Sequence, residues 1–256
     1  MISDYLKYLF QSGNEHSLHS PFLFDFYTKV VKDKQPLPDY AAIEELRKEL
    51  LKNERAIAIT DFGAGSKRTS ANERKIKDIA RNSQKSPKLA QLFYRIVRHY
   101  QYKHIFDLGT SLGLTTAYLA KANPSAQILT FEGCPETAAI ATENFKKLHL
   151  TNLEIVVGNL DETLEKQLKQ VNKIDFAFFD ANHRYQPTVS YFEKCLNRVV
   201  EDTCFIFDDI YWSDEMKKAW QYIINHPQVT ISLDMFWVGI VFFRTKQPKQ
   251  HFVLRL

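Results

Sequence analysis

The chain has 256 residues, 45% hydrophobic and 25% charged, a composition ordinary for a globular protein with a substantial core. Its net charge is +4, and lysine and arginine are interleaved with acidic residues, which argues against a nucleic-acid partner. The 3 cysteines show no CxxC spacing, which argues against a disulfide scaffold or a zinc site and favours a cytoplasmic location. No signal peptide is evident, and the longest apolar run, 235–243, is too short for a membrane-spanning helix, so no membrane contact is expected.

The first hundred residues lack a regular alternation of strands and helices. Helical patterns cover 20–33, 40–53 and 86–100 and surround an apolar run at 56–62. We therefore predict that residues 1–83 form a mostly helical accessory region or lid, and that 84–256 form the main domain.

The apolar run leads into "TDFGAGSKRTS" at 60–70, which lacks the GxxxxGK[ST] pattern of a phosphate-binding loop. Gly63 and Gly65 permit positive φ angles, while Ser66, Lys67 and Arg68 bring donors and positive charge to the tip. Two interpretations stay open: a lid over a cofactor or acceptor, and a tight turn with a solvated basic tip.

From residue 104 onward, short apolar runs alternate with amphipathic segments of helical length. This alternation is typical of parallel strands buried on both faces and joined by helices. After the last helix, two further runs follow so closely that they must form an antiparallel hairpin. The sequence predicts an α/β, Rossmann-like sheet of seven strands, five parallel plus a C-terminal antiparallel hairpin, flanked by helices. The five parallel runs are 104–108, 127–132, 153–157, 174–180 and 203–209.

The loop after the first of these strands, "FDLGTSLG" at 106–113, has the composition of a cofactor-binding turn. Gly109 follows the strand end and Gly113 begins the next helix, but Ser111 occupies the middle position of a GxGxxG pattern. The spacing therefore suits a pyrophosphate poorly and suits a cofactor without phosphate, such as S-adenosylmethionine.

Polar residues at three consecutive strand ends support a cofactor site. Asp107 could accept a hydrogen bond from a cationic amino group, directly or through water, and Glu132 could accept from both hydroxyls of a ribose. Asn159 follows the third strand, where its amide could pair with an adenine edge. Because the carboxyl ends of parallel strands meet at one edge of a sheet, we expect these three groups to converge on one crevice.

The series "FDLGTSLGLTTAYLA", "FEGCPE" and "IDFAFFDANHRY", together with the terminal hairpin, resembles class I S-adenosylmethionine-dependent methyltransferases. The resemblance covers roughly residues 84–244 and is nearest the catechol and caffeoyl-coenzyme A O-methyltransferase branch. Residues 1–80 resemble the N-terminal extension of a bacterial subgroup. The resemblance implies S-adenosylmethionine as cofactor, held by Asp107, Gly109, Thr110, Ser111, Gly113, Glu132, Gly133, Asn159 and Asp180.

In the resembled branch, an Asp after the fourth strand and an Asp-Asn pair after the fifth bind Mg²⁺. Asp180 matches the first ligand and Asp208 the second, while Asp209 replaces the usual Asn and adds negative charge. The alternative is that strand alternation points only one of Asp208 and Asp209 into the cleft. The resemblance thus implies a possible Mg²⁺ site formed by Asp180, Asp208 and Asp209.

His183 stands three residues after Asp180, where the branch often has a Lys. A histidine there has a pKa suited to general-base work near neutrality, so His183 and Asp180 are the predicted catalytic residues. The other interpretation of His183 is a hydrogen-bonded loop residue without a catalytic role.

The predicted function is S-adenosylmethionine-dependent methylation of a small-molecule hydroxyl. One alternative is an NAD-dependent oxidoreductase, since Glu132 would suit a nicotinamide ribose, but the missing middle glycine and the terminal hairpin count against it. Another is an RNA-associated, methyltransferase-like binding module that uses Lys67, Arg68 and Arg74. The sequence predicts neither the oligomeric state nor whether the acceptor is a phenol, a sugar hydroxyl, an amine or a modified nucleotide.

Overall fold

The computed structural model describes residues 2–14, 18–60 and 73–256, and the glycine-rich loop at 61–72 lies outside these ranges. The chain forms two compact units: a terminal unit of residues 1–33 and 164–256, and a middle unit of residues 34–163. The division into an accessory region, 1–83, and a cofactor domain, 84–256, stays a prediction. Within the described ranges, no helix combines the length and the apolar character that crossing a membrane requires.

The middle unit contains three parallel strands in the order β3-β4-β5. Its strands are β3 (His104–Leu108), β4 (Gln127–Glu132) and β5 (Leu153–Val157). Ile105, Phe106 and Leu108 of β3 are at most 1% exposed, as expected for a strand covered on both faces. The predicted bounds of these three strands are confirmed.

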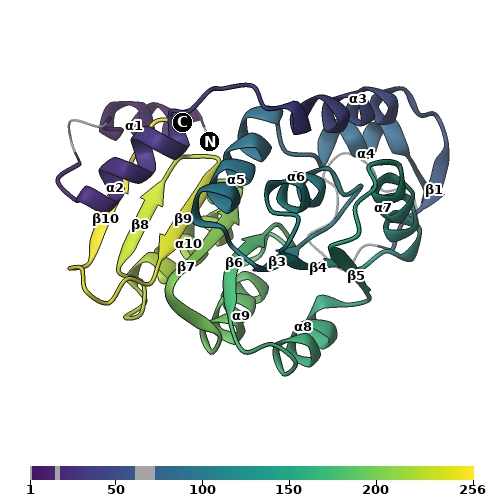
Figure 1. Cartoon of the computed structure of the whole chain (residues 1–256). Coiled ribbons are helices and arrows are strands. Elements are labelled where there is room, and N and C mark those ends of the chain that lie inside the picture. Colours follow the sequence, from purple (N-terminus) through teal and green to yellow (C-terminus); the bar gives the residue numbers. More distant parts are fainter. Residues whose placement is uncertain (1, 15–17, 61–72) are drawn as a thin grey trace. The chain divides into compact units, whose positions relative to one another are not determined.

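Helices α3 (Pro38–Lys52), α5 (Pro87–Tyr100), α6 (Leu114–Ala122) and α7 (Pro135–Lys147) belong to the same unit. Ser86 accepts a hydrogen bond from the Leu89 amide, and Pro87 occupies the first helical turn, so the start of α5 follows from its sequence. Helix α6 packs against α3 and α5, and all of its residues except Lys121 are buried (Figure 1). Its position explains why its sequence is apolar on every side.

A separate antiparallel pair, β1 (Ala56–Ala58) and β2 (Glu73–Lys75), precedes α4 (Ile76–Asn82). The described part of the apolar run at 56–62 therefore contributes β1 to this pair and not a strand of the main sheet. The predicted lid residues Gly63, Gly65, Ser66, Lys67 and Arg68 lie outside the described residues, so the two interpretations of that loop stay predictions.

The terminal unit contains five strands in the order β10-β8-β9-β7-β6. Strand β6 is parallel to β7, β9 is antiparallel to both β7 and β8, and β10 is parallel to β8. The strands are β6 (Ile174–Phe179), β7 (Val199–Asp208), β8 (Ile231–Asp234), β9 (Val238–Phe242) and β10 (Gln250–Val253). The α/β class and the C-terminal hairpin are confirmed.

The predicted count of seven strands is wrong, because β10 is an eighth strand beyond the hairpin and outside the β1–β2 pair. Its residues, QHFV, are intermediate or exposed and do not form an apolar run. Pairing of Gln250 with Ile231 and of Val253 with Asp234 defines the strand. The N-terminal segment lies along it, since the Gly13 amide donates to the Val253 carbonyl over 2.9 Å.

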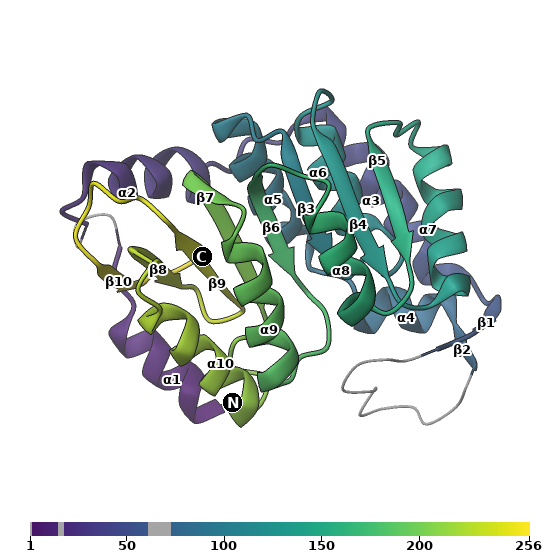
Figure 2. The same ribbon diagram turned by 90° about the horizontal axis from the view of Figure 1, so that it is seen from below.

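Helices cover both faces of β9. Phe242 packs against Phe22 and Phe26, with ring centroids 5.1 and 5.5 Å apart. A Cβ on Gly239 would lie 2.5 Å from the Trp220 ring. Gly239 and Phe242 point to opposite faces of β9, because alternate residues of a strand do so. The helix that carries Trp220 therefore covers the face opposite to Phe22 and Phe26. Figure 2 shows α9 and α10 side by side. The helices of this unit are α1 (Ile2–Gln11), α2 (Pro21–Phe26), α9 (Tyr185–Leu196) and α10 (Asp214–Asn225), with a π-helical segment η2 (Tyr27–Val31). The unit boundary falls within α8 (Leu160–Leu168).

Candidate cofactor and metal sites

The loop between β3 and α6 makes a tight turn that returns to the end of β4. Gly109, Ser111 and Gly113 all have positive φ angles, of 130°, 49° and 82°. The Thr110 amide donates to the carbonyl of Phe131 on β4 over 2.9 Å. The two glycines therefore serve the backbone path that the sequence pattern predicts.

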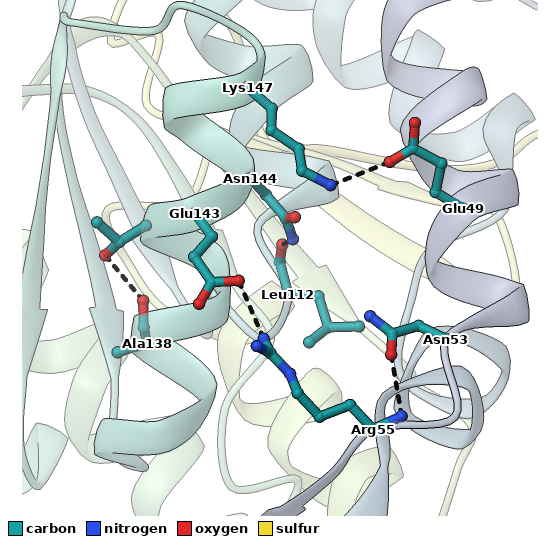
Figure 3. A network of polar contacts seen from close by, with 9 residues as sticks. Glu49, Asn53, Arg55, Leu112, Ala138, Glu143, Asn144 and Lys147 are labelled. Atoms are coloured by element: carbon teal, nitrogen blue, oxygen red, sulfur yellow. Dashed lines mark hydrogen bonds and ion pairs between the residues drawn. The ribbon is translucent and has the colours of Figure 1, made fainter.

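Helix α7 fixes this loop from the other side. The Asn144 amide group donates to the Leu112 carbonyl over 2.9 Å, and Asn144 is buried (Figure 3). A Cβ on Gly113 would lie only 2.5 Å from Cε1 of Phe145. Gly113 thus combines a left-handed backbone with close packing, and either property alone would favour glycine.

Ion pairs join α7 to the segment that leads from α3 into β1 (Figure 3). Lys147 pairs with Glu49 over 3.0 Å, and Arg55 pairs with Glu143 over 2.9 Å. All four side chains are about half exposed, so solvent screens both pairs and each contributes less than about 1 kcal/mol to stability. The buried Asn144 contact, rather than these pairs, is what secures the loop.

Glu132 ends β4 with its carboxylate held by two backbone amides. One oxygen accepts from the Ser111 amide over 2.8 Å, and the other accepts from the Cys134 amide over 2.9 Å. Gly133 is the residue between Glu132 and Cys134 in the chain. A carboxylate has about four acceptor positions and is a suitable acceptor for the hydroxyls of a ribose. The structure therefore brings Ser111 and Glu132 together, whereas convergence of Asp107, Glu132 and Asn159 on one crevice stays a prediction.

Asp107 lies in a buried network of threonine hydroxyls. One carboxylate oxygen accepts from Thr116 over 2.5 Å and from Thr130 over 2.9 Å, and Thr130 also contacts the Thr110 hydroxyl at 2.6 Å. Asp107 is 0% exposed. The sequence analysis missed Thr116 and Thr130, whose signal is a hydroxyl within an otherwise apolar helix or strand. Contact between Asp107 and a cofactor stays a prediction.

Asn159 begins helix α8. Its side-chain oxygen accepts from the Asp161 amide over 3.0 Å, and its carbonyl accepts from the Thr163 amide over 3.0 Å. This capping uses the oxygen of the amide and leaves its NH₂ group as the donor available to a ligand. The predicted adenine contact is compatible with that arrangement and stays a prediction.

In the terminal unit, three predicted residues come together at the ends of β6 and β7. The parallel strands pair Phe179 with Phe207, so Asp180 and Asp208 follow at adjacent positions. One ligand atom each of Asp180, His183 and Asp208 lie within 4.8 Å of one another. His183 Nε2 lies 3.4 Å from an oxygen of Asp180.

Asp209 is not part of this group of three. Its backbone has a φ of 51°, and its amide donates to the Trp237 carbonyl over 2.9 Å. The strand therefore ends at Asp208, and the chain turns away at Asp209, as the alternative interpretation of this Asp-Asp pair expects.

The group fits a divalent cation by the chemistry of its donors. Two carboxylates suit Mg²⁺, which binds one or two carboxylates and keeps several waters. An imidazole extends the choice to first-row transition ions.

Asp234, which was not among the predicted residues, holds the turn between β8 and β9. Its side chain is buried, and its two oxygens accept from the Phe236 amide over 2.9 Å and from the Tyr211 hydroxyl over 2.6 Å. Phe236 has a φ of 66°, a strained backbone for an aromatic residue. Burial, followed by the bond to Asp234, raises the pKa of Tyr211, so this hydroxyl stays protonated at neutral pH. The only signal in the sequence is an acid within an apolar hairpin.

Comparison with known proteins identifies the domain that contains these strand ends. Residues 106–210 match a family described as a methyltransferase domain. This stretch of the chain is a methyltransferase domain. The prediction made from the resemblance is confirmed, and the oxidoreductase and RNA-binding alternatives are not favoured.

Relatives of this methyltransferase domain carry O-methyltransferase names. A catechol O-methyltransferase of Niastella koreensis is 27% identical over 128 residues, which are 49% of this chain and 57% of that protein. An O-methyltransferase of Aspergillus flavus is 34% identical over 86 residues, or 31% of this chain and 35% of that protein. The matches thus span about half and a third of the lengths of these relatives.

Solved structures share the fold. The S-adenosylhomocysteine-bound methyltransferase PaMTH1 of Podospora anserina superposes with a TM-score of 0.62 at 15% identity, covering 89% of this chain and 97% of that one. At this level of identity the likeness shows the fold, and function must be argued from the site.

Proposed function

We propose that the protein transfers the methyl group of S-adenosylmethionine to an oxygen atom of a small molecule. The observation that carries the proposal is the geometry of Glu132 within the matched methyltransferase domain. Two backbone amides hold this carboxylate at the end of β4, facing the turn that contains Ser111. The names of the two relatives, both O-methyltransferases, support oxygen as the methylated atom.

Each predicted cofactor residue has a distinct task in this proposal. Glu132 accepts hydrogen bonds from the ribose hydroxyls, and the Asn159 NH₂ group donates to the adenine. Gly109 and Gly113 let the backbone approach the cofactor closely, while Asp107 orders the turn through Thr110 and Thr130. Contacts of Thr110, Ser111, Gly133 and Asp180 with the cofactor complete the predicted set.

Asp180 and Asp208 would hold a divalent cation on the acceptor side. Such an ion, when bound, lowers the pKa of a coordinated hydroxyl and orients it. The acceptor oxygen then displaces the sulfur in line: an O–C bond forms, the S–C bond breaks, the sulfur leaves as a neutral thioether, and the hydroxyl proton passes to a base. His183 could serve here as a base or as a metal ligand, and a single nitrogen cannot do both at once.

Calorimetric binding of S-adenosylhomocysteine and of NADH to the purified protein tests the cofactor assignment. We expect S-adenosylhomocysteine alone to bind, and Glu132→Ala to weaken it by about 10²-fold or more, because it removes two hydrogen bonds to a charged group. Glu154→Ala, an exposed acid on β5, is the matched control. Binding of NADH alone, or an unchanged affinity in Glu132→Ala, would refute the proposal.

Methyl transfer is tested separately with a catechol as the acceptor, in the presence and absence of a divalent cation. We expect a mono-O-methylated product. Failure with catechol but success with another hydroxyl compound would keep the reaction class and change the acceptor. Methylation of an amine but of no hydroxyl would contradict the proposed reaction.

A further inference from the structure

We propose that His183 is the third protein ligand of a cation site with Asp180 and Asp208, and that this site prefers Mn²⁺ to Mg²⁺. The inference deepens the proposed function by reassigning His183 from base to ligand and by leaving Asp209 outside the site. The family resemblance, by contrast, implies an all-carboxylate site of Asp180, Asp208 and Asp209.

The three side chains are sufficiently close and sufficiently buried to bind one ion together. One ligand atom of each lies within 4.8 Å of those of the other two. Asp208 is 1% exposed, and the side chains of Asp180 and His183 are 12% and 25% exposed. Two carboxylates that are this close and this little exposed repel each other, and a cation between them would offset both that repulsion and their desolvation.

The backbone between Asp180 and His183 folds so that the imidazole returns toward the carboxylate. Asn182 and His183 have φ angles of 64° and 22°, and the His183 amide donates to the Ala181 carbonyl over 3.0 Å. A left-handed backbone at a residue other than glycine carries strain, and strain of this kind clusters at active sites and ligand sites. Here the strained turn brings His183 Nε2 within 3.4 Å of Asp180.

Asp209 is held away from the group by its own backbone contacts. Its amide bonds to the Trp237 carbonyl, and Asp208 pairs with Val238 in the neighbouring strand, so the end of β7 is fixed by the hairpin. Because its φ is 51°, the chain no longer follows the strand at this residue. Among the described residues, His183 and not Asp209 is therefore the third side chain that joins Asp180 and Asp208.

The donor set determines the preferred ion. Mg²⁺ prefers oxygen ligands in near-ideal octahedral geometry, whereas an imidazole nitrogen suits first-row transition ions. Among these ions, Mn²⁺ is one that also suits carboxylates. With Nε2 bound to a metal, His183 cannot accept the acceptor's proton. The proton would then leave through solvent or another group, so no histidine base is required.

The test treats the whole chain with a chelator and then measures the binding of one metal ion at a time. Calorimetry measures the binding of Mn²⁺ and Mg²⁺, and visible absorption measures the binding of Co²⁺. We expect wild-type protein to bind Mn²⁺ at least about 10-fold more tightly than Mg²⁺. His183→Gln replaces the nitrogen with an amide oxygen, so we expect it to lose most of this discrimination and the Co²⁺ absorption typical of a nitrogen ligand. Asp209→Asn should bind all three ions as wild type does.

His226→Gln is the matched control for loss of a histidine in the same unit, and circular dichroism checks the fold of each variant. If His183→Gln keeps the wild-type discrimination while Asp209→Asn loses metal affinity, the ligand assignment is wrong. If no ion binds at millimolar concentration, the site is not a metal site. Binding of S-adenosylhomocysteine to the same samples shows independently whether the proposed cofactor function holds.

Discussion

Replacement of Gly113 by alanine should destabilise the middle unit through two separable effects. The φ angle of 82° places the residue in the left-handed region, which costs a residue with a Cβ about 1–2 kcal/mol. The new Cβ would also lie 2.5 and 2.6 Å from two ring carbons of Phe145. That ring is 3% exposed and has little room to move, and overpacking of this kind costs about 1–3 kcal/mol.

We therefore expect Gly113→Ala to lower the free energy of unfolding in urea by roughly 2–5 kcal/mol, the sum of these two effects. A double-mutant cycle with Phe145→Leu separates them, because leucine removes the ring that the Cβ meets and leaves the backbone strain unchanged. The double variant should be more stable than the sum of the single effects predicts, by about 1–2 kcal/mol.

Two results would refute this reasoning. A wild-type stability for Gly113→Ala would show that the turn relaxes without cost. Strict additivity in the cycle would show that Phe145 does not limit the space at residue 113. S-adenosylhomocysteine binding by the folded fraction then reports whether the altered turn still accepts the cofactor.

Three further predictions follow from buried polar contacts. Asp234→Asn should lower the unfolding free energy by about 2–3 kcal/mol, since an amide cannot accept from both donors, whereas Tyr211→Phe should cost less. Burial, and next the hydrogen bond to Asp39, raise the pKa of Tyr94 to about 12 in the folded protein. The neutral hydroxyl therefore contributes its full stability below pH 10, and this contribution should be lost as the pH rises toward 12. Asn144→Ala should cost about 1–3 kcal/mol, whereas Glu49→Gln, which breaks only an exposed ion pair, should change stability by less than about 0.5 kcal/mol.

The measurements are urea unfolding for each variant and, for the alkaline range, unfolding at several pH values together with the absorbance of phenolate. Equal losses in Asp234→Asn and Tyr211→Phe would show that the backbone bond of Asp234 contributes nothing. For Tyr94, the same alkaline loss in Tyr94→Phe would assign the effect to other groups. A larger loss in Glu49→Gln than in Asn144→Ala would contradict the ranking of buried over exposed contacts.

The sequence by itself determined the α/β class and the bounds of the first three parallel strands. Strands β3, β4 and β5 have the bounds that their apolar runs predict, because burial on both faces requires such runs whatever surrounds them. The positions of Glu132 and Gly113 follow from the same local pattern. The resemblance to methyltransferases also follows from the sequence, and the match over residues 106–210 confirms it.

Tertiary structure decided what local periodicity does not encode. Strand β10 exists through its pairing with β8, because its own residues form no apolar run. The Asp-Asp pair is equivalent in sequence, yet only Asp208 joins Asp180 and His183, since the amide of Asp209 bonds to Trp237 in the hairpin. The physical reason is that the direction of a side chain at a strand end depends on positive φ angles and on hydrogen bonds to residues distant in the chain. Those bonds form only when the strands pair.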